Sequence, residues 1–158
     1  MSVRVATVLS ARDWEPNLIA HARDSASLRI VLRAYQPEDI DKHTREIDVV
    51  VAGAETSWVT AAVIAGWKRA GLSVIGVAPE GDQPAFGMLE LGGCNEVVPD
   101  TTDTSALVQA VRFVVPAERP EVENRSGRVV AVVGPRGAPG RSEVAVAFSY
   151  RCSRVGRS

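Results

Sequence analysis

Asp48-Val49-Val50-Val51-Ala52-Gly53-Ala54-Glu55 is a short apolar run with β-branched residues at its centre and a carboxylate at each end. Such a run is typical of a strand buried on both faces, because helices cover both sides of a parallel sheet. Residues 4–9 and 72–78 have the same character, and segments with helical spacing separate the runs. This alternation predicts a right-handed βαβ sheet, whose chemistry lies on the loops at the carboxyl ends of its central strands. Asp48 is expected at the start of the strand, with Gly53 closing it and Glu55 on the loop beyond.

Five strand-and-helix units are predicted within residues 1–116. The second helix is expected to run from Gln36 to about Ile47, and the third from 58 to 70 after a cap at Thr56 and Ser57. In the second strand, Arg29 and Arg33 are four positions apart, which predicts that they share one face of an edge strand. The predicted fold class is therefore α/β: a flavodoxin-like, doubly wound, five-stranded parallel sheet of order 2-1-3-4-5 with an appended βα fragment.

The chain of 158 residues is 46% apolar and has a net charge of −1, but its charges are unevenly distributed. Residues 1–118 hold 10 basic and 16 acidic side chains, whereas residues 119–158 hold 8 arginines and 3 glutamates. This basic tail could contact nucleic acid, but it could equally be a solvated surface that happens to be rich in arginine. Nucleic-acid binding is therefore not expected. No apolar run approaches the roughly 18 residues that span a bilayer, and the start of the chain lacks a signal-peptide pattern. Cys94 and Cys152 show no metal-ligand spacing, which favours reduced thiols in a cytoplasmic protein without a metal site.

The register and spacing of these five units resemble a response-regulator receiver domain. A receiver holds Mg²⁺ with an acidic pair after its first strand, and its phosphoacceptor aspartate closes the third strand. A hydroxyl closes the fourth strand and a lysine the fifth, because phosphoryl transfer needs a metal, a nucleophilic oxygen and a cation. At the matching positions this chain has Ser10 and Ala11, then Gly53, Ala78 and Pro99. The resemblance implies a pseudo-receiver: the fold without the phosphotransfer and without catalytic residues.

A second motif follows residues 117–127, which are polar and aperiodic and are predicted to be a linker. A buried-type strand near 128–133 leads into a loop rich in glycine and proline, a hydroxyl and an apolar, helix-like run. This is the layout of a phosphate-binding loop, where backbone amides and a helix N-terminus bind the anion. Residues 128–158 are therefore predicted to be a truncated P-loop ATPase fragment, although a simple turn also fits. The candidate nucleotide-binding residues are Gly134, Arg136, Gly137, Gly140, Arg141 and Ser142.

The loop resembles the deviant phosphate-binding loop of the MinD/ParA ATPases, with Arg136 in place of the signature lysine and Arg141 in place of the loop lysine. A pseudo-receiver followed by such a loop is similar to the CpaE/TadZ family of pilus-assembly and septum-site ATPases. In that family the ATPase domain forms a nucleotide-dependent dimer, and the receiver-like domain directs localisation or partner binding. The resemblance implies protein partners from the pilus or division machinery and polar or membrane association through them. A homodimer through the last two βα units, at 88–114, is also expected.

Three functions remain open at this point. The first is a non-catalytic localisation or interaction module. The second is an ATP-binding ATPase whose remaining half lies in a longer chain or in a partner. ATP and Mg²⁺ would then bind only in the full-length context, because the strands with the Walker B carboxylate are expected beyond Ser158. The third is a small-molecule sensor that binds near Ser10, Gly53 and Ala78, where the loss of the phosphotransfer side chains leaves room.

Overall fold

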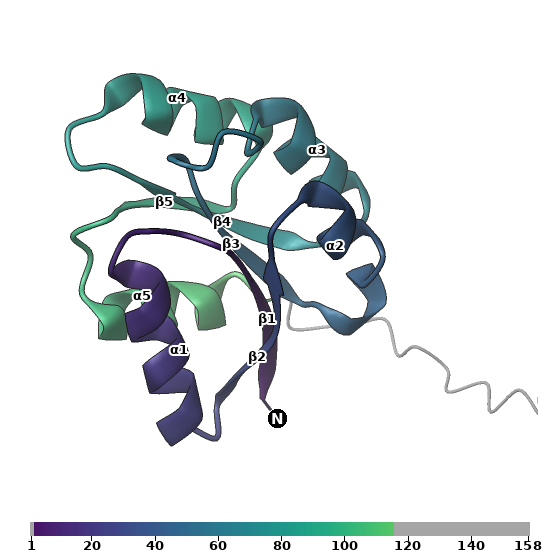
Figure 1. The fold of residues 1–158 in the computed structure, drawn as a ribbon, viewed down its shortest axis with the longest axis vertical. Helices are drawn as coiled ribbons and strands as arrows, with labels where there is room; N and C mark the ends of the chain where they lie inside the picture. Colours follow the sequence, from purple (N-terminus) through teal and green to yellow (C-terminus); the bar gives the residue numbers. More distant parts are fainter. Residues whose placement is uncertain (1, 116–158) are drawn as a thin grey trace, which may run out of the picture. The chain divides into compact units, whose positions relative to one another are not determined.

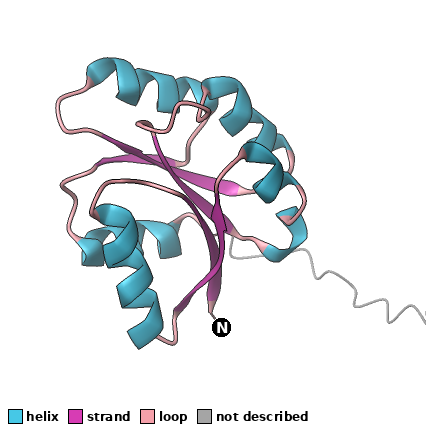
Figure 2. Cartoon of the chain, viewed as in Figure 1, coloured by secondary structure: helices cyan, strands magenta, loops and turns pink. Residues whose placement is uncertain are grey.

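Parallel strands form one sheet with helices on both of its faces (Figure 1, Figure 2). The computed structural model describes residues 2–115; the predicted linker at 117–127 and ATPase fragment at 128–158 lie outside that range. The strands are β1 (Val3–Val8), β2 (Leu28–Ala34), β3 (Val49–Gly53), β4 (Ser73–Ala78) and β5 (Glu96–Pro99). The helices are α1 (Trp14–Asp24), α2 (Pro37–Asp41), the 3-10 turn η1 (Thr44–Glu46), α3 (Ala61–Arg69), α4 (Gln83–Gly92) and α5 (Thr104–Phe113).

The order of the five strands is β2-β1-β3-β4-β5, which confirms the predicted topology. Helices α2, α3 and α4 lie on one face of the sheet, and α1 and α5 lie on the other (Figure 1). The central strand β3 is buried along its whole length, as its uninterrupted apolar sequence predicts. Because all pairings are parallel, the carboxyl ends of the strands meet at one end of the sheet.

The edge strand β2 contains an irregularity that corrects one prediction. Val5 of β1 pairs with Ile30, but the next residue, Ala6, pairs with Leu32, so Val31 is an extra residue in β2. An extra residue reverses the alternation of side chains beyond it. Arg29 and Arg33 therefore lie on opposite faces of the sheet, and the prediction that they share a face is wrong.

Helix α3 begins later than its sequence pattern predicts. The helix was expected to start at Trp58 after a cap at Thr56 and Ser57, but it starts at Ala61. The side chain of Thr60 accepts a hydrogen bond from the amide of Val63 at 3.3 Å. This cap satisfies an amide of the first turn and fixes the start of the helix.

The second predicted helix is also shorter than expected. It ends at Asp41 and is followed by the separate turn η1, rather than continuing to Ile47. Ile40 is the buried residue of α2, and the polar His43 and Thr44 come next on its inner side. A continuous helix there has too little apolar surface to hold it against the sheet.

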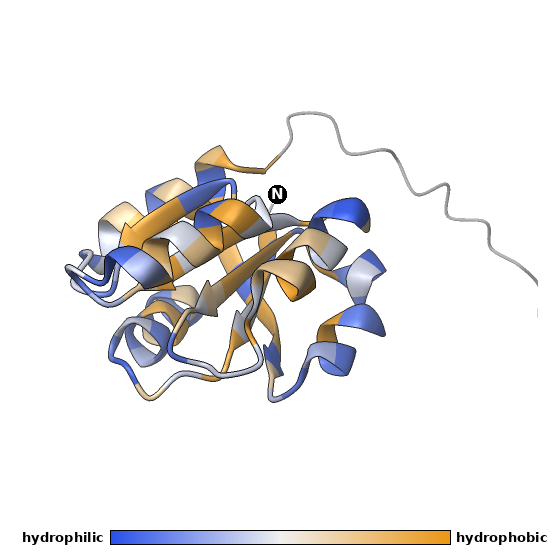
Figure 3. Ribbon diagram, turned by 90° about the horizontal axis from the view of Figure 1, so that it is seen from above, coloured by the Kyte–Doolittle hydropathy of each residue, from blue (hydrophilic) through white to orange (hydrophobic). Residues whose placement is uncertain are grey.

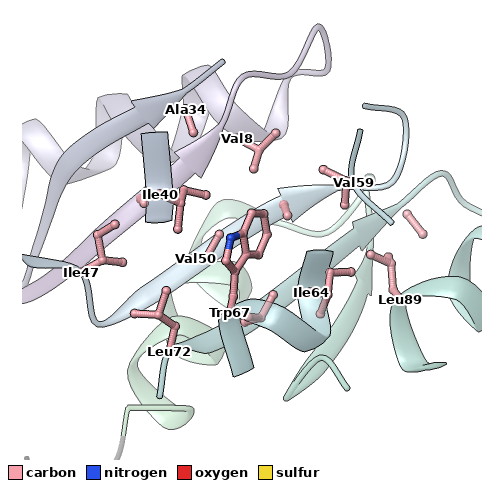
Figure 4. Close-up of a cluster of buried hydrophobic side chains, with 14 residues drawn as sticks. Val8, Ala34, Ile40, Ile47, Val50, Val59, Ile64, Trp67, Leu72 and Leu89 are labelled. Carbon is pink, nitrogen blue, oxygen red and sulfur yellow. The ribbon is translucent and has the colours of Figure 1, made fainter. Parts of the chain in front are cut away.

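Two apolar clusters form the core, one on each face of the sheet. On the α2–α4 side, the indole of Trp67 is 1% exposed and lies between the sheet and α3, near Val50 and Ile64 (Figure 4). It packs edge-to-face against Trp58, with ring centroids 6.2 Å apart. On the other side, Leu18 of α1 and Leu107 of α5 pack on the sheet. Apolar strands enclosed between helices with polar outer faces are visible in Figure 3.

None of the helices in residues 2–115 is long and apolar enough to cross a membrane.

Candidate functional site

The candidate site is the end of the sheet where the loops after β1, β3, β4 and β5 converge. The structure places Ser10 two residues beyond β1, Gly53 at the end of β3 and Ala78 at the end of β4. Pro99 is the last residue of β5 and pairs with Ala78. These positions are the ones that the resemblance to a receiver predicts for them. The side chains that phosphoryl transfer requires are therefore missing at their expected places.

A carboxylate nevertheless occupies the space beside Gly53. Glu55, on the loop after β3, folds back so that its carboxylate lies against Gly53, too close to leave room for a Cβ there while it keeps this position. The hydroxyl of Ser10 donates a hydrogen bond to Glu55 Oε1. Thr56 joins the same two loops through a hydrogen bond from its hydroxyl to the carbonyl of Leu9, at 3.3 Å. These two hydrogen bonds hold the loops after β1 and β3 together.

The charges on the outer loops are reversed relative to the receiver pattern. The loop after β1 carries a cation, Arg12, and the loop after β5 carries a carboxylate, Asp100. Arg12 Nη1 lies 3.3 Å from Asp100 Oδ2, and the other Asp100 oxygen accepts a hydrogen bond from the amide of Glu80 at 3.0 Å. This ion pair links the loops after β1, β4 and β5 across the end of the sheet.

Beneath these loops, the carboxylate of Glu15 is completely buried at the start of α1. Its Oε1 accepts hydrogen bonds from the hydroxyl of Thr7 and from Nε of Arg33, both at 2.9 Å. Its Oε2 accepts from the amide of Ser10 at 2.9 Å and from Nη2 of Arg33 at 3.1 Å. Glu15 thus joins β1, β2, α1 and the loop that carries Ser10, and it orients the residue that binds Glu55.

Burial alone would raise the pKa of Glu15, because a low dielectric disfavours the charged form. The hydrogen bonds from Arg33, the Ser10 amide and Thr7 outweigh that effect, and the pKa of Glu15 is lowered from its ordinary value. The same bond to Glu15 raises the pKa of Arg33. The pair is therefore ionised at neutral pH and has a structural role.

The residues at this site do not fit the Mg²⁺ ion that a receiver holds. Ser10 and Ala11 stand where the acidic pair would be, and the Glu55 carboxylate is engaged by Ser10. Asp13 precedes α1, but its side chain does not even cap the helix. Within residues 2–115, no group of three or more histidine, cysteine, aspartate or glutamate side chains is arranged to hold a metal. We therefore derive no step through a metal ion.

The sensor hypothesis depended on free space at the same place. Removing the phosphoacceptor side chain was expected to leave room around Gly53, but the carboxylate of Glu55 takes that room. Two grooves of the described domain lie elsewhere, one beside β5 and α5 and one at the β2 edge beside α1. The strand ends thus offer no support for a ligand site at Gly53.

The predicted nucleotide-binding residues lie outside the described residues. They are Gly134, Arg136, Gly137, Gly140, Arg141 and Ser142, all beyond residue 115. Their role in binding ATP and Mg²⁺ stays a prediction.

The solved structures that resemble this domain share the receiver fold. No family model matches the chain, and no curated protein does. Among solved structures, the signal receiver domain of the response regulator NarL from Mycobacterium tuberculosis matches with a TM-score of 0.57 and 16% identity, over 70% of this chain and 97% of that one. The described domain has the receiver fold.

Two further receiver-like structures are similar to this domain. CheY6 from R. sphaeroides, solved in complex with the P1 domain of CheA3, matches with a TM-score of 0.57 and 14% identity, over 72% of this chain and 98% of that one. A pilus assembly-related protein from Burkholderia pseudomallei matches with a TM-score of 0.52 and 17% identity, over 71% of this chain and 88% of that one. At these identities the likeness concerns the fold.

Sequence reasoning missed how the receiver-like domain fills its strand ends. Glu55 lies on the loop after β3, as the sequence predicts, but the spacing of residues does not predict that its side chain returns over Gly53. A glycine closing the strand, with a carboxylate two residues later, is the signal that could have indicated it. The Glu15–Arg33 pair carries no comparable signal, because the face of Arg33 depends on the extra residue Val31.

Proposed function

We propose that the described domain is a receiver-like interaction module that works without phosphorylation. The observation that carries this proposal is the Glu55 carboxylate, which lies over Gly53 and is bound by Ser10. A phosphoacceptor aspartate would need this space, and a receiver would need a metal and a lysine beside it. Here the same loops are joined by Ser10–Glu55 and Arg12–Asp100. The module then offers its partners one fixed arrangement of these loops.

The partners that we propose belong to pilus assembly or to cell-pole and septum-site positioning, in a CpaE/TadZ-like system. Two observations favour this choice. The MinD/ParA-like loop with Arg136 and Arg141 follows the domain in the sequence, and a pilus assembly-related protein is among the structures with the same fold. The solved complex of CheY6 with a domain of CheA3 is an example of a receiver that binds a protein partner.

Phosphoryl labelling tests the central proposal. The full chain is incubated with Mg²⁺ and phosphoramidate, and its intact mass is measured. We expect no mass increase of one phosphoryl group, either in the natural chain or in a Gly53→Asp variant, because Ser10 and Ala11 supply neither of the carboxylates that hold Mg²⁺ in a receiver. A labelled natural chain contradicts the proposal. Labelling of the Gly53→Asp variant alone would show that the site keeps more of the chemistry than we infer.

ATP binding by residues 134–142 is a second candidate function, favoured by the glycine-rich loop and the hydroxyl of Ser142. Titration calorimetry of the full chain with Mg-ATP tests it. Micromolar affinity that is lost in an Arg141→Ala variant would support nucleotide binding. An Arg151→Ala variant, which changes an arginine outside the loop, is the matched control.

We also propose that the domain forms a homodimer through the surface of α4, β5 and α5. Leu91 of α4 is 82% exposed and Phe113 of α5 is 87% exposed, which is unusual for large apolar side chains. Phe113 also lines a groove of about 710 Å³ beside β5, together with Glu96 and Gln109. The groove is also lined by Ala106, Ala110 and Val114, and an exposed apolar ring beside such a partly apolar groove is typical of a surface that binds a protein.

A further inference from the structure

The outer edge of β2 is a further surface of the domain, separate from the strand-end loops and from the proposed dimer surface. Within residues 2–115, β2 pairs with β1 alone, so its other edge is open. Every second amide and carbonyl of an edge strand points away from its neighbour and can pair with another strand. A groove of about 430 Å³ lies at this edge, and its lining combines α1 with residues from both faces of β2. Its apolar lining comes from Ile19 and Ala22 of α1 and from Ile30, Val31 and Leu32 of β2.

The groove has a strongly basic lining. Arg23, Arg29 and Arg33 line it, and no aspartate or glutamate does. By contrast, residues 2–115 as a whole hold 10 basic and 15 acidic side chains. The charge of Arg33 is compensated by Glu15. Arg23 and Arg29 form no ion pair with any residue that the structure describes, so their charges are available to a partner.

The arginines lie on both sides of the edge. Arg29 pairs in register with Arg4, which reaches Asp48 and the carbonyl of Arg45 on the α2 side of the sheet. Arg23 belongs to α1, on the opposite side. A ligand confined to one side of the sheet would meet one of these cations. An extended segment along the edge would meet both, because its successive side chains point to opposite faces.

We propose that the β2 edge is a docking site for an extended acidic segment of a partner protein, which adds to the sheet as a strand. Adjacent acidic residues would reach Arg23 on one side and Arg29 on the other, and an apolar residue beside them would enter the groove. Main-chain hydrogen bonds would supply affinity and the alternating side chains would supply selectivity.

Two other occupants fit less well. A second copy that pairs β2 with β2 would bring the arginines of both copies together, and like charges opposite each other are destabilising. Nucleic acid is attracted by extended basic surfaces, whereas this domain has an excess of acidic side chains. The inference rests on the interaction role proposed above but uses a different surface. If no peptide binds at the β2 edge, the phosphoryl-labelling and dimer experiments keep their meaning. If either of those proposals fails, the peptide titration still tests the β2 edge.

The probe is the synthetic peptide Val-Glu-Glu-Val-Glu-Glu-Val, titrated into the full chain and followed by heteronuclear NMR. We expect saturable shifts of the amide signals of Leu28–Ala34. Affinity should fall about fivefold for each of Arg23→Glu and Arg29→Glu, the size of an exposed charge pair. Arg69→Glu, which reverses an exposed arginine at the end of α3 and lies outside both proposed surfaces, is the matched control and should leave affinity unchanged.

Two modified peptides separate strand addition from simple charge attraction. One is N-methylated at its odd positions and the other at its even positions, so that each lacks half of its amide donors. Only one of the two should lose binding, because only one set of amides faces β2. Equal affinity for both overturns strand addition. The proposal is also overturned by equal binding of the lysine version of the peptide, by tighter binding of a single-stranded oligonucleotide at the same arginines, or by no saturable shift.

Discussion

Glu15 shows at the scale of one residue how the strand-end loops are held. Its buried carboxylate accepts four hydrogen bonds, and two of them come from Arg33, whose side chain is 44% exposed. Removing the cation leaves a buried carboxylate with the Thr7 hydroxyl and the Ser10 amide alone. The balance between burial and hydrogen bonding then shifts towards the protonated acid. The pair therefore has a measurable effect on stability.

We expect Arg33→Met to lower the free energy of unfolding by about 2 kcal/mol, less than a fully buried pair would, because Arg33 is half-exposed. Urea unfolding of the full chain measures it. Arg29→Met is the matched control, since Arg29 lies on the same strand without an ion pair among residues 2–115, and its effect should stay within about 0.5 kcal/mol. Equal effects of the two substitutions would show that the pair with Glu15 contributes nothing specific.

The lowered pKa of Glu15 also predicts a dependence on pH. A carboxyl whose folded-state pKa lies below its ordinary value stabilises the fold above that value, near 4.5, and loses this contribution as the pH falls through the folded-state pKa. A Glu15→Gln variant lacks this titration. The stability difference between the natural chain and the variant should therefore be constant at neutral pH and shrink below the ordinary pKa. If the stability difference between the natural chain and Glu15→Gln stays constant as the pH falls below 4.5, the pKa of Glu15 is not lowered in the folded state. Asp39, whose pKa is lowered by the Tyr35 amide, titrates in both proteins and cancels.

At the scale of elements, the pairing of α3 with α4 depends on a glycine. A Cβ on Gly92 would lie 2.8 Å from Cβ of Ile64 and 3.1 Å from the Cα of Ala61, both on α3. The contact is to a side-chain stem and to backbone, so neither neighbour can rotate away. Gly87, on the same helix α4, faces open space. Both glycines belong to α4, but only Gly92 is needed for the close packing of α4 against α3.

We expect Gly92→Ala to destabilise the domain by about 1–3 kcal/mol through overpacking. Gly87→Ala should stabilise it by up to about 1 kcal/mol, because alanine is the better helix former and nothing obstructs it. Thermal unfolding of both variants measures the difference. If both substitutions raised or both lowered the stability of the domain, the close packing of α3 on α4 at Gly92 would be contradicted.

Some elements could be predicted from sequence and others could not, for physical reasons. The apolar run at 49–53 predicts a buried central strand because burial on both faces leaves no polar position. Val31 carries no such signal, because an extra residue in an edge strand depends on how β1 and β2 are paired rather than on its own side chain. The start of α3 likewise depends on which of several nearby hydroxyls makes the cap, and Thr60 rather than Thr56 does so.

At the scale of the whole domain, residues 2–115 have the receiver fold, but Gly53, Ala78 and Pro99 close the strands where phosphoryl transfer needs polar side chains. Five apolar strands and their helices determine the topology, so the order 2-1-3-4-5 follows from the pattern of buried positions. The site consists of single side chains on loops, and contacts between loops distant in sequence decide where those side chains point. Ser10 and Glu55 are 45 residues apart, and Arg12 and Asp100 are 88 apart. A pattern of local spacing predicts the loops but not these pairs.

Self-association gives the last prediction at this scale. If α4, β5 and α5 form the dimer surface, Phe113→Lys should weaken self-association about tenfold or more, because an anchor of this kind contributes over 1 kcal/mol when it is buried in an interface. Lysine also suits the end of α5, where a cation is favourable, so the domain should stay folded. Tyr35→Lys is the matched control, because this aromatic side chain is 64% exposed and follows β2, at the other edge of the sheet from β5. Sedimentation equilibrium of the full chain measures both variants. A monomeric natural chain, or equal losses in the two variants, contradicts this dimer surface.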